Sequence, residues 1–415
     1  MAVSDVQRPG LRRALFLGWL LFLLVRAGLG LATPDEDALG KEAGYPVGTS
    51  ATMSQDRFKV GSFTAMDRVL PHNPVRMGVH RFEFSRAANE PAIVYQHKGK
   101  TYTVDDYLAR QRVTGLLVIK DGQIVIERYQ YGRKGSDKFN SFSMAKSITS
   151  LAVGLALSEG KIRSLDDKAA TYVPELAGTA YGETPIRDLL RMSSGVKFSE
   201  DYSGRDDNAD MQWMALRHGL LEFLKRYGDR IAASGERFNY ASSETTALGF
   251  VVRGATGRTL ADYLSEKVWQ QLGAEADAFW CTDAKGAERA SAFFNATLRD
   301  FGRLGWLLAN DGALDGRQVL PKEYVLEATS WKSHPPQFHP RKAAPFFGYG
   351  YQFWIEPGEH RRFWLLGLFG QAIAVDPEYK LVMVHTAVAK DAKATDIWPE
   401  KFALWKAIVS HYGKR

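Results

Sequence analysis

Residues 141–160 read SFSMAKSITSLAVGLALSEG, and this stretch carries the strongest signals for both the fold and the chemistry of the chain. Gly160 stands where a helix would end. Apolar side chains recur before it at helical spacing: Ile148, Leu151, Ala152 and Leu155. The pattern predicts a buried, central helix over residues 143–160.

Ser143 and Lys146 lie three positions apart, so on a helix they share one face and the amine can reach the hydroxyl. A serine hydroxyl needs a neighbouring base to become a nucleophile, and a lysine desolvated in a cleft has a pKa low enough to serve. The N-terminus of the helix also favours a developing oxyanion, which the N–H of Ser143 can help to bind. We therefore predict that Ser143 is the nucleophile and Lys146 its base. A capping serine with a solvated lysine is the alternative.

Tyr240 is a candidate third catalytic residue. It lies in the run Phe238-Asn239-Tyr240-Ala241-Ser242, immediately before a helical pattern that starts at Ser242. If its phenol faces Ser143 and Lys146, it can pass a proton to a leaving group. A core ring with a satisfied hydroxyl is the structural alternative.

The pattern around the motif predicts an α+β fold. Two β-rich runs flank Asp121-Gly122 and indicate a hairpin within residues 116–129. Helical patterns follow at 184–192, 210–226, 242–255, 260–272 and 297–310. Strand patterns then occupy 349–355, 362–368, 371–375 and 381–387, before a last helix at 399–411. This order indicates a sheet domain with a helical insertion at about 160–310.

Composition excludes several classes of function. The net charge is +7, but Lys and Arg are scattered, so we expect no nucleic-acid partner. The single cysteine, Cys281, permits no intramolecular disulfide and no thiolate cluster. The nine histidines are dispersed, and no His-Glu-x-x-His, phosphate-binding or dinucleotide motif occurs. We expect neither a metal nor a cofactor.

The N-terminal region divides into two segments. In residues 1–32, Arg12 and Arg13 precede the apolar run 14–25, and small residues follow up to Ala32. This pattern predicts a signal peptide, with an uncleaved N-terminal anchor as the alternative. The protein is therefore expected to be periplasmic or secreted, or else tethered to the membrane. Residues 33–90 are predicted to form an extended arm, and residues 91–412 the main domain.

The motifs together resemble the serine β-lactamase and penicillin-binding-protein superfamily, in its class C-like and esterase-like branch. Ser143-Met144-Ala145-Lys146 is similar to its first motif, Tyr240-Ala241-Ser242 to its second and Gly370-Gln371 to its third. The resemblance covers about residues 90–412. It is strongest to the 6-aminohexanoate-dimer hydrolases, which cleave short nylon-type amides and often esters. It implies a β-lactamase/transpeptidase-like fold, in which helices flank an antiparallel sheet.

The resemblance also implies roles for individual residues. Ser143 would be acylated, Lys146 would be its base and Tyr240 would assist. The N–H groups of Ser143 and Gln371 would form the oxyanion hole. Substrate-pocket residues would be Tyr202, Ser242, Phe369 and Gly370. A surface-loop position is the alternative for Tyr202. The neighbouring acidic cluster Asp206, Asp207 and Asp210, with Trp213, is a candidate for the mouth of the cleft, and a solvated loop is the alternative for the cluster.

The third motif departs from the usual pattern, because Leu368 and Phe369 precede Gly370 where the superfamily offers Lys or His. A group that would hold a substrate carboxylate is therefore missing from the motif. We predict a serine hydrolase that cleaves small amides or esters through an acyl-enzyme on Ser143. The alternatives are a β-lactamase-like or D-alanyl-D-alanine carboxypeptidase-like activity, or a non-catalytic penicillin-binding-like receptor.

Overall fold

An eight-stranded sheet lies at the centre of the computed structural model, which describes residues 1–2 and 33–413. Neighbouring strands are antiparallel except β2, which pairs parallel to β6. In spatial order the strands are β12 (Gly348–Tyr349), β13 (Trp354–Ile355), β14 (Phe363–Leu366), β15 (Ala372–Asp376), β16 (Leu381–Ala387), β5 (Val113–Lys120), β6 (Gln123–Tyr129) and β2 (Ser85–Arg86). The predicted hairpin is confirmed as β5–β6.

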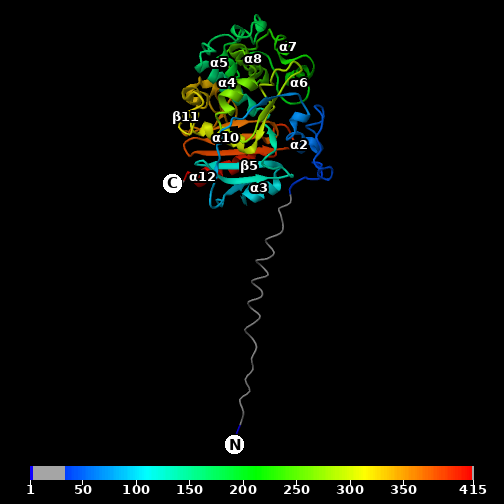
Figure 1. Ribbon diagram of the computed structural model, residues 1–415, viewed down its shortest axis with the longest axis vertical. Coiled ribbons are helices and arrows are strands. Elements are labelled where there is room, and N and C mark those ends of the chain that lie inside the picture. The colour runs from blue at the N-terminus through cyan, green and yellow to red at the C-terminus, as the bar shows by residue number, and fades with distance from the viewer. Residues whose placement is uncertain (3–32, 414–415) are drawn as a thin grey trace.

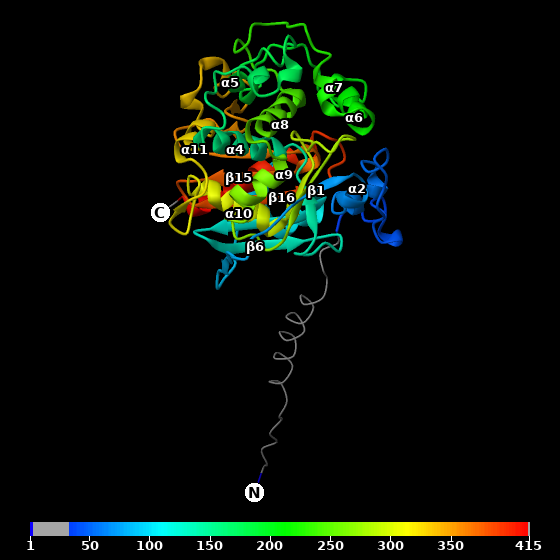
Figure 2. The ribbon, with the colours of Figure 1, turned by 45° about the horizontal axis from the view of Figure 1, so that its top comes forward.

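Helices cover both faces of the sheet. Side chains alternate between the two faces along each strand, so each strand contributes to a core on either side. On β5, Leu117 and Ile119 belong to the larger core, which includes α10 (Leu298–Ala309). Leu116 and Val118 belong to a second core on the other face. That core is closed by α3 (Val104–Arg110) and α12 (Trp398–Tyr412). Figure 2 shows α10 in front of β15 and β16.

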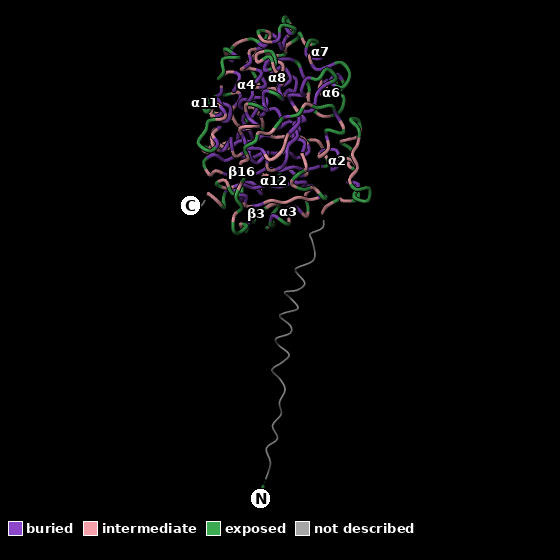
Figure 3. The backbone as a smooth tube through the Cα atoms, in the orientation of Figure 1, coloured by how far each residue is buried: buried purple, intermediate pink, exposed green. Residues whose placement is uncertain are grey.

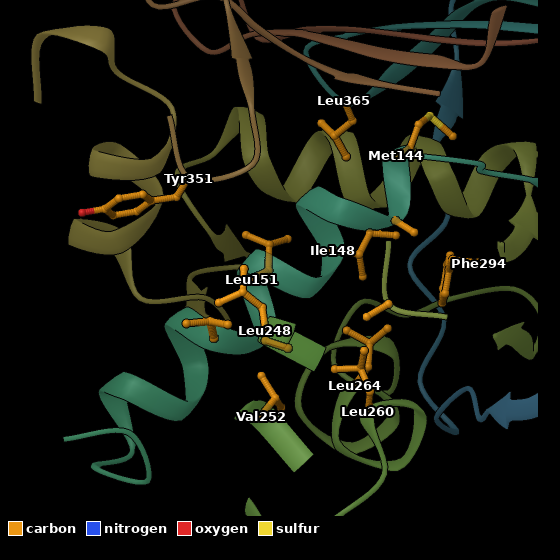
Figure 4. Close-up of a cluster of buried hydrophobic side chains, with 14 of the residues drawn as sticks. Met144, Ile148, Leu151, Leu248, Val252, Leu260, Leu264, Phe294, Tyr351 and Leu365 are labelled. Carbon is orange, nitrogen blue, oxygen red and sulfur yellow. The ribbon is translucent and has the colours of Figure 1, made fainter. Parts of the chain in front are cut away.

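The predicted central helix is confirmed as α4 (Met144–Ser158), in which thirteen of the fifteen residues are buried. It packs on α8 (Ser242–Thr256) through the cluster in Figure 4, where Leu151 of α4 lies near Leu248 of α8. Most residues of both helices are buried, and Figure 3 draws buried residues in purple. The other helices around them are α5 (Ile186–Leu190), α6 (Asp207–Arg217), α7 (Leu220–Leu224), α9 (Leu260–Leu264) and α11 (Lys322–Ala328).

Several predicted elements differ in the structure. The helical pattern at 210–226 is two helices, α6 and α7, because Gly219 adopts a φ of 97° between them. The strand expected at 349–355 is the pair β12 and β13, because the chain turns between them with Gln352 at a φ of 66°. The pattern at 260–272 begins as α9 and continues as a π-helix over Ser265–Trp269.

The segment predicted as a helical insertion also contains strands. A four-stranded sheet joins β1 (His72–Val75), β8 (Ala278–Cys281), β9 (Phe294–Thr297) and β7 (Lys138–Asn140). Short hairpins complete the fold: β3 (Val94–His97) with β4 (Lys100–Thr103), and β10 (Ala313–Leu314) with β11 (Arg317–Gln318). Periodicity did not indicate β8 or β9, because each is only four residues long and buried throughout.

The N-terminal arm is not simply extended, because it contains the helix α2 (Asp56–Ser62) and the strand β1. The predicted leader at 1–32 lies almost wholly outside the described residues. Among the residues that are described, no helix has both the length and the apolar character needed to cross a membrane.

Candidate active site

Ser143 occupies the N-terminal cap of α4 and is held there by the residues before it. The Ser141 N–H donates to Phe294 O of β9 at 2.8 Å, and the Phe294 N–H donates back to Ser141 Oγ at 3.1 Å. Phe142 adopts a φ of 43°, a left-handed conformation that is strained for a bulky residue. This turn presents Ser143 at the end of the helix. Within the described chain, the Ser143 N–H has no hydrogen-bond acceptor.

The Lys146 amine meets three oxygens. Its Nζ lies 2.9 Å from Ser143 Oγ, 2.9 Å from Ser242 Oγ and 3.0 Å from Ser291 O. A carbonyl oxygen only accepts, and the Ser242 hydroxyl donates its proton to Glu200 Oε1 at 2.8 Å. A neutral Lys146 amine therefore gives its two protons to Ser242 and Ser291. Its lone pair is left for the hydroxyl proton of Ser143, which is the geometry of a general base.

Burial brings the titration of Lys146 close to physiological pH. Burial lowers the pKa of Lys146 to about 8, although the negative charge of Glu200 acts in the opposite direction. The side chain is 2% exposed, and no carboxylate among the described residues forms an ion pair with it. Desolvation disfavours the ammonium form, so the free amine is accessible without an unusual pH.

Tyr240 joins the same group of residues. Its hydroxyl hydrogen-bonds Ser143, and the Lys146 Nζ lies 5.0 Å from the centre of its ring. The ring stacks on Trp354 at 5.5 Å between centroids and meets Tyr349 edge-on. Burial raises the pKa of Tyr240 well above its ordinary value, so the phenol keeps its proton. The structure therefore brings Ser143, Lys146 and Tyr240 together, as the sequence predicts.

Glu200 links two of the predicted pocket residues and was not identified from the sequence. It accepts hydrogen bonds from the Ser242 N–H at 2.7 Å, from the Ser242 hydroxyl at 2.8 Å and from the Tyr202 hydroxyl at 2.8 Å. Tyr202 is half-buried rather than a free surface residue. Asp206 Oδ2 accepts from its backbone N–H at 2.6 Å and holds its loop in place. The only sequence signal for Glu200 is its closeness to Tyr202.

The Gln371 side chain points away from catalysis, whereas its backbone lies at the site. Its amide pairs with Ala387, donating at 2.7 Å and accepting at 3.0 Å. The Gln371 N–H lies 3.4 Å from Leu368 O, which is longer than an ordinary hydrogen bond. This N–H is therefore only weakly committed within the protein.

Two neighbouring cavities meet at Ser143. The first, of about 410 Å³, is walled mainly by apolar side chains and includes Gly370 and Gln371. The second, of about 240 Å³, is more polar and includes Ser242 and Phe369. Both cavities share Ser143, Glu200, Tyr202, Leu368 and Ala392. All four predicted pocket residues therefore line one cavity or the other. A larger cavity of about 540 Å³ lies elsewhere and contains none of these residues.

The N-terminal arm forms part of the site, which no sequence pattern indicated. Met53 and Ser54 line the smaller cavity. Phe63 directly follows α2. Its ring lies against Phe142 and Phe369, at 4.8 Å and 5.2 Å between ring centroids. The arm thus supports the backbone on both sides of the site.

Of the residues proposed for the mouth of the cleft, Asp206 lines the smaller cavity, whereas Trp213 and Asp210 line neither cavity. Trp213 is 46% exposed and lines neither cavity, so it does not border the cleft. Asp210 pairs with Arg226 on the surface, at 3.0 Å. In residues 1–2 and 33–413, no three His, Cys, Asp or Glu side chains gather closely enough to hold a metal ion.

Comparisons with known proteins agree with this geometry. The profile of the Beta-lactamase family matches residues 102–396. The chain is 28% identical over 282 residues to the 6-aminohexanoate-dimer hydrolase of Paenarthrobacter ureafaciens, covering 65% of this chain and 70% of the relative. A Bacillus anthracis structure assigned to the 6-aminohexanoate-dimer hydrolases superposes with a TM-score of 0.77 at 26% identity, covering 87% of this chain and 96% of that one. A penicillin-binding-protein homologue from Caulobacter crescentus shares the fold, with a TM-score of 0.56 at 18% identity over 71% of this chain and 91% of that one.

Proposed function

This chain belongs to the Beta-lactamase family and is a serine hydrolase, and we propose that it cleaves small amides or esters through an acyl-enzyme on Ser143. The observation that carries the proposal is the arrangement of three oxygens around the Lys146 amine. Because Ser242 and Ser291 accept the two protons of a neutral Lys146 amine, the lone pair of its nitrogen is left to face the Ser143 hydroxyl. The Lys146 Nζ lies 2.9 Å from Ser143 Oγ. The N–H groups of Ser143 and Gln371 form the proposed oxyanion hole.

In the proposed first step, Lys146 accepts the Ser143 proton while the serine oxygen bonds to the substrate carbonyl carbon. The bond from that carbon to the leaving nitrogen or oxygen then breaks, and the leaving group takes a proton. Tyr240 is placed to pass this proton on, because its neutral phenol hydrogen-bonds Ser143 and its ring lies beside the Lys146 amine. Water then attacks the acyl-enzyme with Lys146 as its base, which frees the acid and restores Ser143.

Of the two cavities that meet at Ser143, the larger one, of about 410 Å³, has walls that favour apolar substrates. Its lining includes Phe347, Trp354, Leu366, Leu368 and Trp398. Neither Leu368 nor Phe369 offers a charge to a substrate carboxylate at the third motif. The third motif therefore supports neutral amides or esters over β-lactams and D-alanyl-D-alanine peptides, although Lys393 and Lys401 also line the cavity. The Paenarthrobacter ureafaciens relative supports short linear amides as the first compounds to test.

We also propose that the protein is exported to the periplasm or secreted, with an N-terminal membrane anchor as the alternative. The support is the sequence of residues 1–32, in which two arginines precede a short apolar run. The mass of the mature protein after expression with its leader distinguishes the two. Loss of about the first 32 residues indicates cleavage, and an intact chain in the membrane fraction indicates an anchor.

Labelling with a fluorophosphonate tests the proposed nucleophile. We expect covalent modification of the wild-type protein at Ser143 and none in Ser143→Ala. Lys146→Ala should stay folded but lose turnover by orders of magnitude, because the amine that faces the Ser143 hydroxyl is removed. A panel of short acyl esters, linear amide oligomers, D-Ala-D-Ala peptides and a chromogenic cephalosporin then ranks the substrates against Ser143→Ala. A folded wild-type protein that resists the probe and hydrolyses nothing on the panel would support a non-catalytic receptor.

A further inference from the structure

The carbonyl oxygen of Gly370 lies directly behind the proposed oxyanion hole. The Gly370 C=O and the Gln371 N–H belong to one planar peptide, so whatever holds the oxygen also sets the direction of the N–H. Two side chains from other elements contact this oxygen: His385 Nδ1 of β16 at 2.8 Å and Lys401 Nζ of α12 at 3.1 Å. Neither residue belongs to a motif identified in the sequence.

His385 is fixed in one tautomer by its two partners. A carbonyl oxygen only accepts, so Nδ1 carries the proton that is donated to Gly370. Nε2 then accepts from the Tyr107 hydroxyl at 2.8 Å. Burial lowers the pKa of His385 to about 3, so the ring stays neutral. His385 therefore supplies direction to the peptide without charge.

Lys401 is a buried amine, and no carboxylate among the described residues forms an ion pair with it. It is 2% exposed, although it contributes to the wall of the larger cavity, and its Nζ lies 4.9 Å from the centre of the Trp398 ring. Its one hydrogen bond within residues 33–413 goes to Gly370. Burying an amine without a counter-charge costs free energy, and a methionine would fill much the same space without that cost. A residue that is expensive to bury and lies beside an active site indicates a role in function.

We propose that Lys401 is a positioning residue of the oxyanion hole, acting through the carbonyl of Gly370. Together with His385 it holds the Gly370–Gln371 peptide so that the Gln371 N–H is directed toward the carbonyl oxygen of a substrate on Ser143. Its hydrogen bond to the Gly370 oxygen polarises that peptide and makes the N–H a stronger donor to the developing oxyanion. The third motif lacks the usual Lys or His, and α12 brings a lysine amine to the same peptide. This inference rests on the proposed function.

The test compares Lys401→Met with Lys406→Met, a matched change at an exposed lysine of the same helix. With p-nitrophenyl acetate, Lys401→Met should lower kcat by about tenfold to a hundredfold, less than the loss of an oxyanion donor itself. KM should hold, and the affinity for a trifluoromethyl ketone, which forms a tetrahedral adduct on serine, should fall by the same factor as kcat. The melting temperature should stay level or rise. Lys401→Arg, which keeps an N–H donor, should recover most of kcat, and Lys406→Met should change nothing.

Three outcomes would overturn the inference. Full kcat in Lys401→Met would show that the peptide needs no support from α12. A raised KM with unchanged kcat and inhibitor affinity would make Lys401 a substrate contact instead. A lowered melting temperature in Lys401→Met would make its role structural. All three outcomes require an active wild-type protein, so they are distinct from failure of the proposed function, in which the wild type shows neither fluorophosphonate labelling nor ester turnover.

Discussion

Phe63 of the N-terminal arm lies edge-on against Phe142, the residue before the nucleophile, with their ring centroids 4.8 Å apart. The same ring contacts Phe369, the residue before Gly370. Phe142 and Phe369 both have positive φ values, of 43° and 57°. Left-handed backbone at bulky residues persists only where the surroundings enforce it. The arm is therefore part of the support that keeps both segments of the active site in place.

Removing the Phe63 ring should impair both stability and catalysis. Phe63 is 4% exposed, so Phe63→Ala should lower the free energy of unfolding by about 3–5 kcal/mol. At temperatures where the variant is still folded, kcat should also fall, because Phe142 and Phe369 lose a shared neighbour. Urea unfolding and ester turnover measure the two effects. Phe58→Ala, at a half-buried ring of the same arm, is the control and should leave kcat unchanged.

Turnover should rise with pH through the titration of Lys146. Burial lowers the pKa of this amine to about 8, and only its neutral form accepts the Ser143 proton. At pH values well below 8 the ammonium dominates and kcat/KM should fall about tenfold for each further pH unit. A pH profile of kcat/KM for a neutral ester measures this limb. A flat profile between pH 6 and 9 would contradict Lys146 as the base.

Neutralising Glu200 should move that limb to lower pH. Its carboxylate favours the ammonium form of Lys146 and so opposes the effect of burial on the pKa. In Glu200→Gln the opposing charge is gone, so the midpoint of the kcat/KM profile should shift to lower pH. Maximal kcat should also fall, because the amide holds the Ser242 hydroxyl less firmly. Asp201→Asn, an exposed neighbour, serves as the control, and a midpoint that does not move would argue against the influence of Glu200.

Tyr240→Phe should affect amides more than activated esters. The phenol is proposed to carry a proton to the leaving group, and an amine must be protonated to depart, whereas p-nitrophenolate leaves without one. We expect kcat for a linear amide to fall by about 10²- to 10⁴-fold and kcat for p-nitrophenyl acetate to fall less. Equal losses on both substrates would instead indicate that Tyr240 acts by holding Ser143.

Glu244 should make stability depend on pH. Burial raises the pKa of Glu244 to about 8, above that of an unfolded glutamate, although hydrogen bonds from Ser194 act in the opposite direction. The folded state therefore binds this proton more tightly, and the resulting stability is fully present below the unfolded pKa of about 4.5 and is lost as pH rises from there through about 8. The melting temperature should drop over that range, and Glu244→Gln should flatten the drop. Glu222→Gln, at an exposed glutamate, should leave the wild-type curve unchanged.

Much of the fold was predictable because its signals are local. The helix α4 follows from apolar spacing over residues 143–160, and the β5–β6 hairpin follows from Asp121-Gly122. The strands β8 and β9 were missed because a four-residue buried strand has no alternation to detect. The break at Gly219 between α6 and α7 was missed because the hydrophobic pattern continues through it.

By itself the sequence determined that a serine and a lysine share one turn at the start of a buried helix, since helical geometry links positions three apart. The tertiary structure alone decided what surrounds them. Ser242, Glu200 and Ser291 orient the Lys146 amine, and each comes from a distant segment. Lys401 likewise reaches Gly370 from a helix thirty-one positions away. Such contacts depend on how the sheet, the helices and the arm pack together, and local sequence patterns do not predict that packing.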